Sequence, residues 1–123
     1  MAGKIIADTL EHSTAGSIAT NYVVEGSAKA WFHFNMSAAT LQDSLNASSI
    51  TDSATGTFLM NLSSALSSIE YATLSASGDN ATHNASADTN QPRSSSQYSH
   101  NHFENNAATD IANVSNSALG DLA

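Results

Sequence analysis

Hydrophobic and polar residues alternate in several short segments of this chain, which is the period-two pattern of β-strands. The alternation is strongest over residues 29–36, where Trp31 and His33 fall on one face. The opposite face consists of Ala30, Phe32, Phe34 and Met36. Because both faces carry bulky side chains, we expect a sheet with a second layer on one side and a partner on the other.

Turn-forming residues separate further segments of this kind. The turn at residues 53–56, Ser-Ala-Thr-Gly, joins residues 45–50 and 58–62 into a predicted hairpin. Four more strands are predicted at residues 21–24, 71–77, 97–103 and 110–119. Short strands with frequent turn signals are typical of sandwiches. The predicted fold is therefore all-β, a small antiparallel β-sandwich that is jelly-roll-like or Ig-like.

A helical alternative exists for two windows of the chain. Four apolar residues recur at helix-like spacing, namely Leu59, Leu62, Leu66 and Ile69. Residues 107–118 could also wind into a helix. Ser, Thr and Asn fill both windows, and their side chains compete with the hydrogen bonds of a helix. We therefore favour strands in both places.

Two regions differ from the strand-rich remainder. Residues 1–20 are predicted as an N-terminal arm, with an edge strand over 5–10 and a break at 12–16, and the arm either packs on a neighbour or anchors the chain. Residues 21–123 then form the sandwich knob. Within the knob, residues 79–95 hold no large apolar side chain and include the only proline, which predicts a mobile polar loop.

The supply of large apolar side chains is small. Phe, Leu, Ile and Val number 22 of 123 residues, below the ~20% at which a chain struggles to form its own core. Each buried large aliphatic side chain contributes roughly 1.5–3 kcal/mol against the entropy of ordering the chain. Either part of the chain is disordered or an interface between copies completes the core. We expect a homo-oligomer, most simply a trimer.

Charge and composition exclude several classes of partner. The net charge is −8, and the three basic residues, Lys4, Lys29 and Arg93, form no stripe, which argues against nucleic acid and anionic membranes as partners. The chain has no cysteine, hence no disulfide or thiolate site. Residues 1–6 lack the apolar stretch of a signal peptide, and no run is long enough to span a membrane. We expect no signal-peptide secretion and no membrane insertion.

One pair of residues has metal-binding character. His100 and His102 lie two apart, so on a strand both imidazoles face the same side. Around a three-fold axis, three copies would bring six nitrogens together, which suits an octahedral transition metal. The competing interpretation is a pair of exposed polar histidines without a ligand. No other cofactor is predicted.

No residue set predicts catalysis. The chain has no G-x-S-x-G motif, and its turn carboxylates are more typical of solubilising residues than of a glycosidase pair; they are Asp43, Asp52, Glu70 and Asp79. Six residues are predicted to carry folding and interface packing: Trp31, Phe32, Phe34, Phe58, Leu74 and Val114. Tyr98 could pack or stack on a sugar. The polar segments 37–44, 51–56 and 78–96 are predicted as recognition loops.

Several stretches of the chain resemble a family of bacteriophage fibre proteins, the tail-fibre-like and receptor-binding-like domains of marine and environmental phages. The most specific stretches are EGSAKAWFHFN at 25–35 and DSLNASSITDSATGTF at 43–58. The start, ADTLEHSTAGSIATNYVVEGSAKAW at 7–31, and the end, VSNSALGDLA at 114–123, are similar to the same family. The resemblance thus covers nearly the whole chain.

The resemblance implies a β-rich, trimeric, non-enzymatic component of a virion that is made in the host cytoplasm. Such a subunit would be a short fibre or knob in the tail fibre or on the capsid surface, in contact with other virion proteins and with a host-surface glycan or protein. Three alternatives stay open. They are a capsid decoration protein without a receptor role, a free carbohydrate-binding module, and a disordered chain that folds on its partner.

Overall fold

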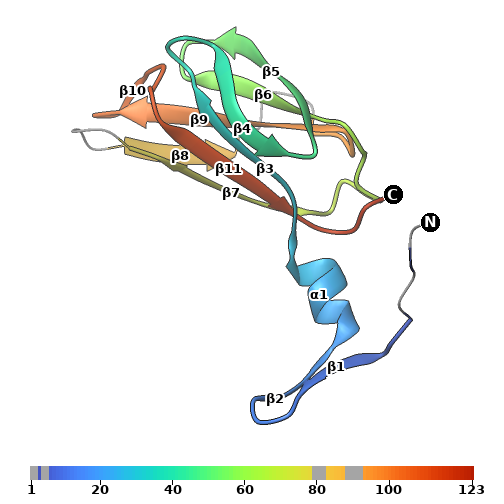
Figure 1. Ribbon diagram of the computed structural model, residues 1–123. Helices are drawn as coiled ribbons and strands as arrows, with labels where there is room; N and C mark the ends of the chain where they lie inside the picture. The colour runs from blue at the N-terminus through green and yellow to red at the C-terminus, as the bar shows by residue number, and fades with distance from the viewer. Residues whose placement is uncertain (1–2, 4–5, 79–82, 88–92) are drawn as a thin grey trace.

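Two antiparallel β-sheets packed face to face form the body of the protein (Figure 1). The structure is a computed structural model that describes residues 3, 6–78, 83–87 and 93–123. The predicted all-β antiparallel sandwich is confirmed. An arm of one short hairpin and one helix precedes the sandwich and projects from one end of it. Over the described part of the chain, no helix has both the length and the apolar character needed to cross a membrane.

The first sheet consists of four strands, and its neighbours are all antiparallel. In spatial order the strands are β4 (Thr40–Leu45), β3 (Ala28–Asn35), β11 (Val114–Leu119) and β7 (Ala72–Ser77). The two central strands, β3 and β11, come from opposite ends of the chain, so this sheet joins the start of the sandwich to its end.

The second sheet is built around a central strand, β9 (Gln97–Glu104). Asn101 of β9 pairs with Thr57 on one edge and with Ser86 on the other. The remaining strands are β5 (Ala47–Ala54), β6 (Thr57–Leu62), β8 (His83–Ala87) and the short β10 (Ala107–Ala108). β9 and β6 each lie between two neighbouring strands, so both edges of each are paired.

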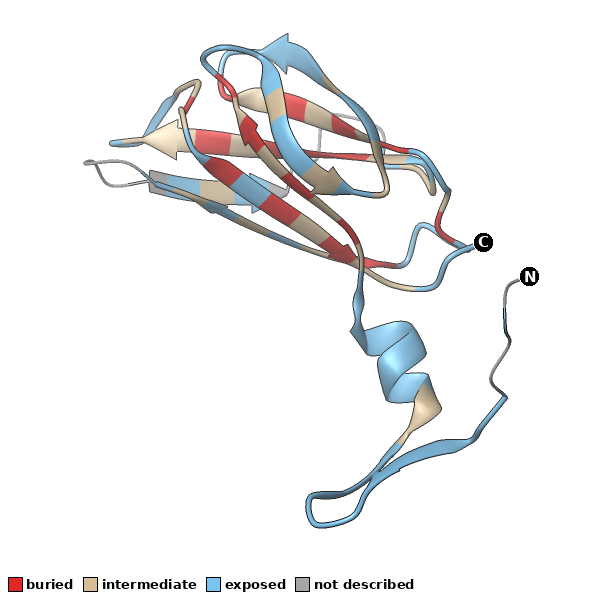
Figure 2. Ribbon diagram, viewed as in Figure 1, coloured by how far each residue is buried: buried red, intermediate tan, exposed pale blue. Residues whose placement is uncertain are grey.

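The core lies between the sheets and follows the alternation of the strands (Figure 2). On β3 the residues Phe32 and Phe34 are buried, as their position on the apolar face predicts. Phe32 meets Tyr98 edge to face at 6.1 Å between ring centroids, and Phe34 meets Phe58 at 5.7 Å. The other buried hydrophobic residues are Ala30, Met36, Met60, Leu62, Leu66, Tyr71, Ile111, Val114 and Ala118. The interior of the sandwich is therefore closed within one chain, although the composition led us to expect that copies would have to complete it.

The predicted hairpin exists with different boundaries. Strands β5 and β6 pair with Ile50 opposite Met60, and the turn between them contains Gly56 with φ of +74°. Leu45, placed in this hairpin from the sequence, instead ends β4 in the other sheet. The left-handed residue Asn46 separates the two strands and redirects the chain between sheets. Of the predicted recognition loop 37–44, residues 40–44 belong to strand β4.

The arm is longer than predicted and contains a helix. It consists of β1 (Thr9–His12), β2 (Gly16–Ala19) and α1 (Thr20–Gly26), and the sandwich begins only at Ala28. The prediction of a strand at 21–24 is therefore wrong. β-Branched residues favour strands where a sheet surface can receive them. Among the described residues no strand pairs with residues 20–26, and the helix satisfies its main-chain groups locally.

The segment 79–95, predicted as a loop, contains strand β8. This strand pairs with β9 through the register Asn84 to Phe103 and Ser86 to Asn101. Polar residues without large apolar partners can add an edge strand because the pairing uses main-chain hydrogen bonds. The rest of that segment, 79–82 and 88–92, lies outside the described residues. Strands also occupy residues 57–62 and 114–119, so the helical alternative is wrong in both windows.

Candidate binding surface

A row of side chains crosses the outer face of the first sheet, away from the second sheet. Cross-strand pairing aligns Leu45 of β4, Trp31 of β3, Ser117 of β11 and Leu74 of β7. Leu45 is 49% exposed and Leu74 is 62% exposed, whereas Trp31 is half-buried. Three apolar side chains aligned on the solvent face of one sheet mark this surface as a candidate binding site.

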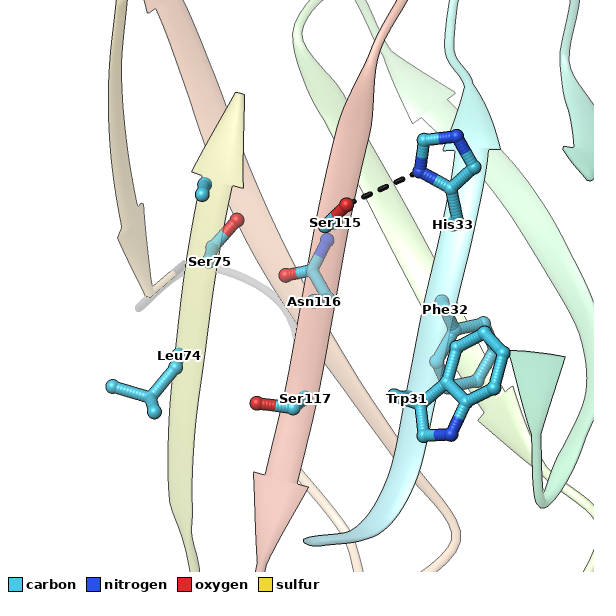
Figure 3. A pocket seen from close by; sticks show the side chains of 9 residues that line it. Trp31, Phe32, His33, Leu74, Ser75, Ser115, Asn116 and Ser117 are labelled. Atoms are coloured by element: carbon cyan, nitrogen blue, oxygen red, sulfur yellow. Dashed lines mark hydrogen bonds between the residues drawn. The ribbon is translucent and has the colours of Figure 1, made fainter. Parts of the chain in front are cut away.

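A second row lies one step along the same strands. It aligns Asp43, His33, Ser115 and Ala76. The His33 ring is held by its neighbour on β11, because Nδ1 lies 3.1 Å from the hydroxyl oxygen of Ser115 (Figure 3). This bond fixes the direction of the imidazole and leaves Nε2 as the ring nitrogen that can meet a ligand.

A hollow of about 460 Å³ lies over these two rows. Trp31 and Leu74 stand on either side of it, and Ser115 and Ser117 lie between them on its floor. Ala76 also lines the hollow. Small side chains on β11 create the hollow, since Trp31 and Leu74 are two strand spacings apart, roughly 10 Å. None of the residues that line it carries a formal charge at pH 7 when His33 is neutral. The hollow thus combines one indole, one aliphatic wall and several hydroxyl groups.

The structure divides the six residues that were predicted to pack. Phe32, Phe34, Phe58 and Val114 are buried in the core, as predicted. Leu74 is not a core residue, because its position on β7 faces outward while Ser75 faces the interior. Trp31 lies at the edge of the hollow with part of its surface exposed. The histidine beside it, His33, lies on the outer face too.

The two histidines of the predicted metal site lie in the interior of the sandwich. His100 and His102 are 3% and 1% exposed, and both project from the central strand β9 toward the first sheet. Nε2 of His102 lies 3.4 Å from the hydroxyl oxygen of Ser75 on the opposite sheet. The interpretation as an exposed pair is wrong, because both rings are buried within one chain. A metal site between subunits would need these rings at the surface, where the structure does not place them.

The environment of His100 favours the neutral imidazole. Burial lowers the pKa of His100 from 6.5 to about 4; the main chain of Ser86 acts in the opposite direction, and the positive charge of Arg93 adds to the lowering. Among the described residues, no group of three or more histidine and acidic side chains is arranged to hold a metal ion. The hydroxyl of Tyr98 and the side-chain amide of Asn116 are buried nearby, without a hydrogen-bond partner in the described part of the chain. Polar groups in such positions are commonly satisfied by buried water.

The carboxylates considered for catalysis lie on separate elements. Asp43 is on β4, Asp52 is on β5 and Glu70 precedes β7, and all three are exposed. Asp79 lies outside the described residues. Of these three, only Asp43 is aligned with the rows beside the hollow. The serines of the hollow were missed from the sequence, because their role follows from the strand register and no local motif marks them.

Comparison with known proteins adds no relative: no protein-family model, no curated protein and no solved structure matches the chain.

Proposed function

We propose that this protein is a non-enzymatic structural subunit of a bacteriophage particle that assembles with copies of itself through its N-terminal arm. It would be a short fibre or knob, in the tail fibre or on the capsid surface. The observation that carries the assembly role is the apolar surface of the arm. Ten large hydrophobic side chains are exposed over the described residues, and six belong to the arm: Ile6, Leu10, Ile18, Tyr22, Val23 and Val24.

Among the described residues, the arm contributes no side chain to the buried core of the sandwich, so packing within the chain does not explain its apolar surface. Figure 2 draws nearly the whole arm in the colour of exposed residues, and no residue of α1 is buried. Isolated helices of seven residues and two-stranded hairpins are marginal in water. Contact with a neighbouring copy would bury the six side chains at roughly 1.5–3 kcal/mol each and would stabilise both elements. The placement in a phage particle rests on the resemblance of residues 25–58 to fibre proteins, and a trimer is the expected state.

Light scattering of the purified protein tests the assembly role. The double variant Ile18→Ser, Tyr22→Ser removes two exposed apolar side chains of the arm, one on β2 and one on α1. We expect the wild type to have the mass of an oligomer and the double variant to dissociate toward monomers, with an unchanged β spectrum by circular dichroism. The matched control is the double variant Ile69→Ser, Leu122→Ser, which removes two exposed apolar residues outside the arm and should retain the wild-type mass. A wild type that is a monomer at all accessible concentrations would contradict the proposal.

The particle placement needs a separate test. Antibody labelling of purified phage particles that encode this chain, followed by electron microscopy, should place the label at the tail or on the head. Mass spectrometry of the same particles should detect the chain at a stoichiometry that is a multiple of the oligomer. Absence of the chain from intact, purified particles would refute the virion role and leave the arm-mediated assembly as a separate result.

A further inference from the structure

We propose that the hollow beside Trp31 is a binding site for an uncharged hexopyranose ring of a glycan. The site lies on the outer face of the first sheet, whereas the proposed assembly uses the arm. The inference therefore stands whether or not copies associate, and it assigns a ligand class to a surface whose residues come from three strands, β3, β11 and β7.

The indole of Trp31 supplies the stacking surface. Sugar rings present an apolar face of C–H groups, which packs on aromatic rings as other apolar groups do. Among the described residues, no other aromatic ring stacks on Trp31, whereas five ring contacts join the aromatic residues and histidines of the interior. The one tryptophan of the chain is thus left at the edge of a hollow on the sheet surface, although burying it in the core would stabilise the fold more.

The polar groups of the hollow suit the hydroxyl groups of the same ring. The serine hydroxyls of Ser115 and Ser117 can each donate and accept hydrogen bonds, and so can the imidazole of His33. These three groups come from adjacent strands and line the same side of the sheet as Trp31. The 3.1 Å contact between His33 and Ser115 holds two of them in place before a ligand arrives, which lowers the entropy lost on binding.

Size and charge narrow the ligand further. The volume of about 460 Å³ lies within the range of small-molecule sites, and the roughly 10 Å between Trp31 and Leu74 admits one six-membered ring. No lysine or arginine lines the hollow, and Asp43 stands beside His33 in the same row. With a net charge of −8 on the chain, sialylated and sulfated sugars would be repelled rather than held. The chemistry therefore favours a neutral sugar.

A second copy of the chain fits this surface less well than a sugar does. A flat apolar interface would need continuous apolar contact, but Ser117 interrupts the row between Trp31 and Leu74. Burying the hydroxyl of Ser117 against an apolar partner would give it no hydrogen bond in exchange for the water it loses, at a cost comparable to the apolar gain. A sugar satisfies this hydroxyl and the indole together.

Trp31 is the only tryptophan, so its fluorescence reports on this site alone. The full-length protein is titrated with four neutral oligosaccharides, maltotriose, mannotriose, lactose and chitotriose, and with sialyllactose as the anionic counterpart of lactose. We expect at least one neutral sugar to change the Trp31 emission in a saturable way and sialyllactose to cause no change. The variant Ser117→Leu fills the floor of the hollow and should weaken binding at least tenfold. Ile69→Ala alters an equally apolar residue outside the hollow and should bind as the wild type does.

The binding of a second variant and the oligomeric mass of Ser117→Leu distinguish a sugar site from a misfolded variant and from an interface between copies. Leu74→Ser removes one wall of the hollow and places no larger side chain in the sheet. It should weaken binding as well, so that the result does not depend on the folding of one variant. The proposal is overturned if none of the four neutral sugars gives a saturable change. It is equally overturned if Ser117→Leu binds within twofold of the wild type, or if that variant lowers the oligomeric mass, because the surface would then be an interface between copies.

Discussion

The carbonyl oxygen of Gly56 accepts a hydrogen bond from the main-chain nitrogen of His102 at 2.7 Å. This bond joins the turn of the β5–β6 hairpin to the central strand β9. The nitrogen of Gly56 in turn donates to the Asp110 carboxylate at 2.6 Å, in the segment that leads to β11. Gly56 thus connects the hairpin turn, strand β9 and the segment that contains Asp110. Strand β6 begins directly after this glycine, and β10 continues along the same edge of β9.

Substitution of this glycine should be costly for two reasons. Its φ of +74° is disfavoured for residues with a Cβ, and a Cβ built there would meet the carbonyl oxygen of His102 at 2.5 Å and the nitrogen of Thr109 at 2.8 Å. We expect Gly56→Ala to lower the free energy of unfolding by about 2 kcal/mol or more, measured by urea denaturation. Gly78→Ala is the control, since nothing lies within 4 Å of a Cβ at that position. Equal stability of the two variants would contradict this interpretation of the turn.

His100 should make the protein sensitive to acid. Its pKa is about 4 in the folded protein against an ordinary 6.5, so the unfolded chain takes up the proton more readily between these values. The stability that depends on a neutral His100 is therefore complete above pH 6.5 and is lost as the pH falls toward 4. Below pH 4 this contribution changes little. The difference of about 2.5 pKa units corresponds to a loss of roughly 3 kcal/mol in the free energy of unfolding. Chemical denaturation at a series of pH values between 7 and 4 measures it.

Comparison between variants separates His100 from the carboxylates, which also titrate in acid. His100→Leu removes the titrating group from the interior and should flatten the stability profile between pH 6.5 and 4. His12→Leu removes an exposed histidine of the arm hairpin and should keep the wild-type profile. A wild-type slope in His100→Leu would show that the acid sensitivity arises elsewhere.

The hydroxyl of Tyr71 holds the chain before β9. It lies 2.8 Å from the carbonyl oxygen of Ser94 and 3.0 Å from that of Gln97, and it can donate to both. Arg93 stacks over the same ring, 4.0 Å from its centroid. Burial raises the pKa of this phenol, so the hydroxyl keeps its proton at neutral pH and remains a donor.

Tyr71→Phe should therefore cost about 1–2 kcal/mol of unfolding free energy, because the two carbonyl groups lose a donor while the ring stays in place. Thermal and urea denaturation of this variant and of Tyr22→Phe provide the comparison. Tyr22 is exposed on α1, and its hydroxyl should contribute nothing measurable to the stability of the sandwich. A Tyr71→Phe variant as stable as Tyr22→Phe would mean that water replaces the phenol.

Strand pairing and the main core could be predicted where the alternation is strong. Over residues 29–36 the alternation separates Ala30, Phe32, Phe34 and Met36 from Trp31 and His33, and Phe32 and Phe34 are buried together as this pattern predicts, although both faces carry bulky side chains. The second strand of the 45–62 hairpin was found for the same reason, through Phe58. In these segments the period of two and the hydrophobicity of the side chains indicate the same buried face, so the sequence alone predicts the strand and its core residues.

The orientation of β7 could not be predicted, because its inward face is polar. Alternation predicts two faces, and hydrophobicity then favoured Leu74 as the buried side. The interior opposite β7 contains His102, however, and Ser75 faces it at 3.4 Å. A polar patch in the interior means that the more polar face of β7 is the buried one, contrary to the usual rule that the apolar face is buried. Nothing in the sequence near β7 marks this patch. The hollow was missed for a related reason, since it exists only once the register places Ser117 between Trp31 and Leu74.

Two leucines test this division between interior and surface directly. Leu66 is 2% exposed and part of the core, although the sequence associated it only with a helical spacing. Leu74 is 62% exposed on the outer face. The same change, Leu→Ala, should cost about 2–5 kcal/mol at Leu66, where it leaves a cavity, and less than about 0.5 kcal/mol at Leu74. Urea denaturation of both variants measures the difference. Costs of similar size would mean that β7 presents its other face to the core, and the hollow beside Trp31 would then lose its second wall.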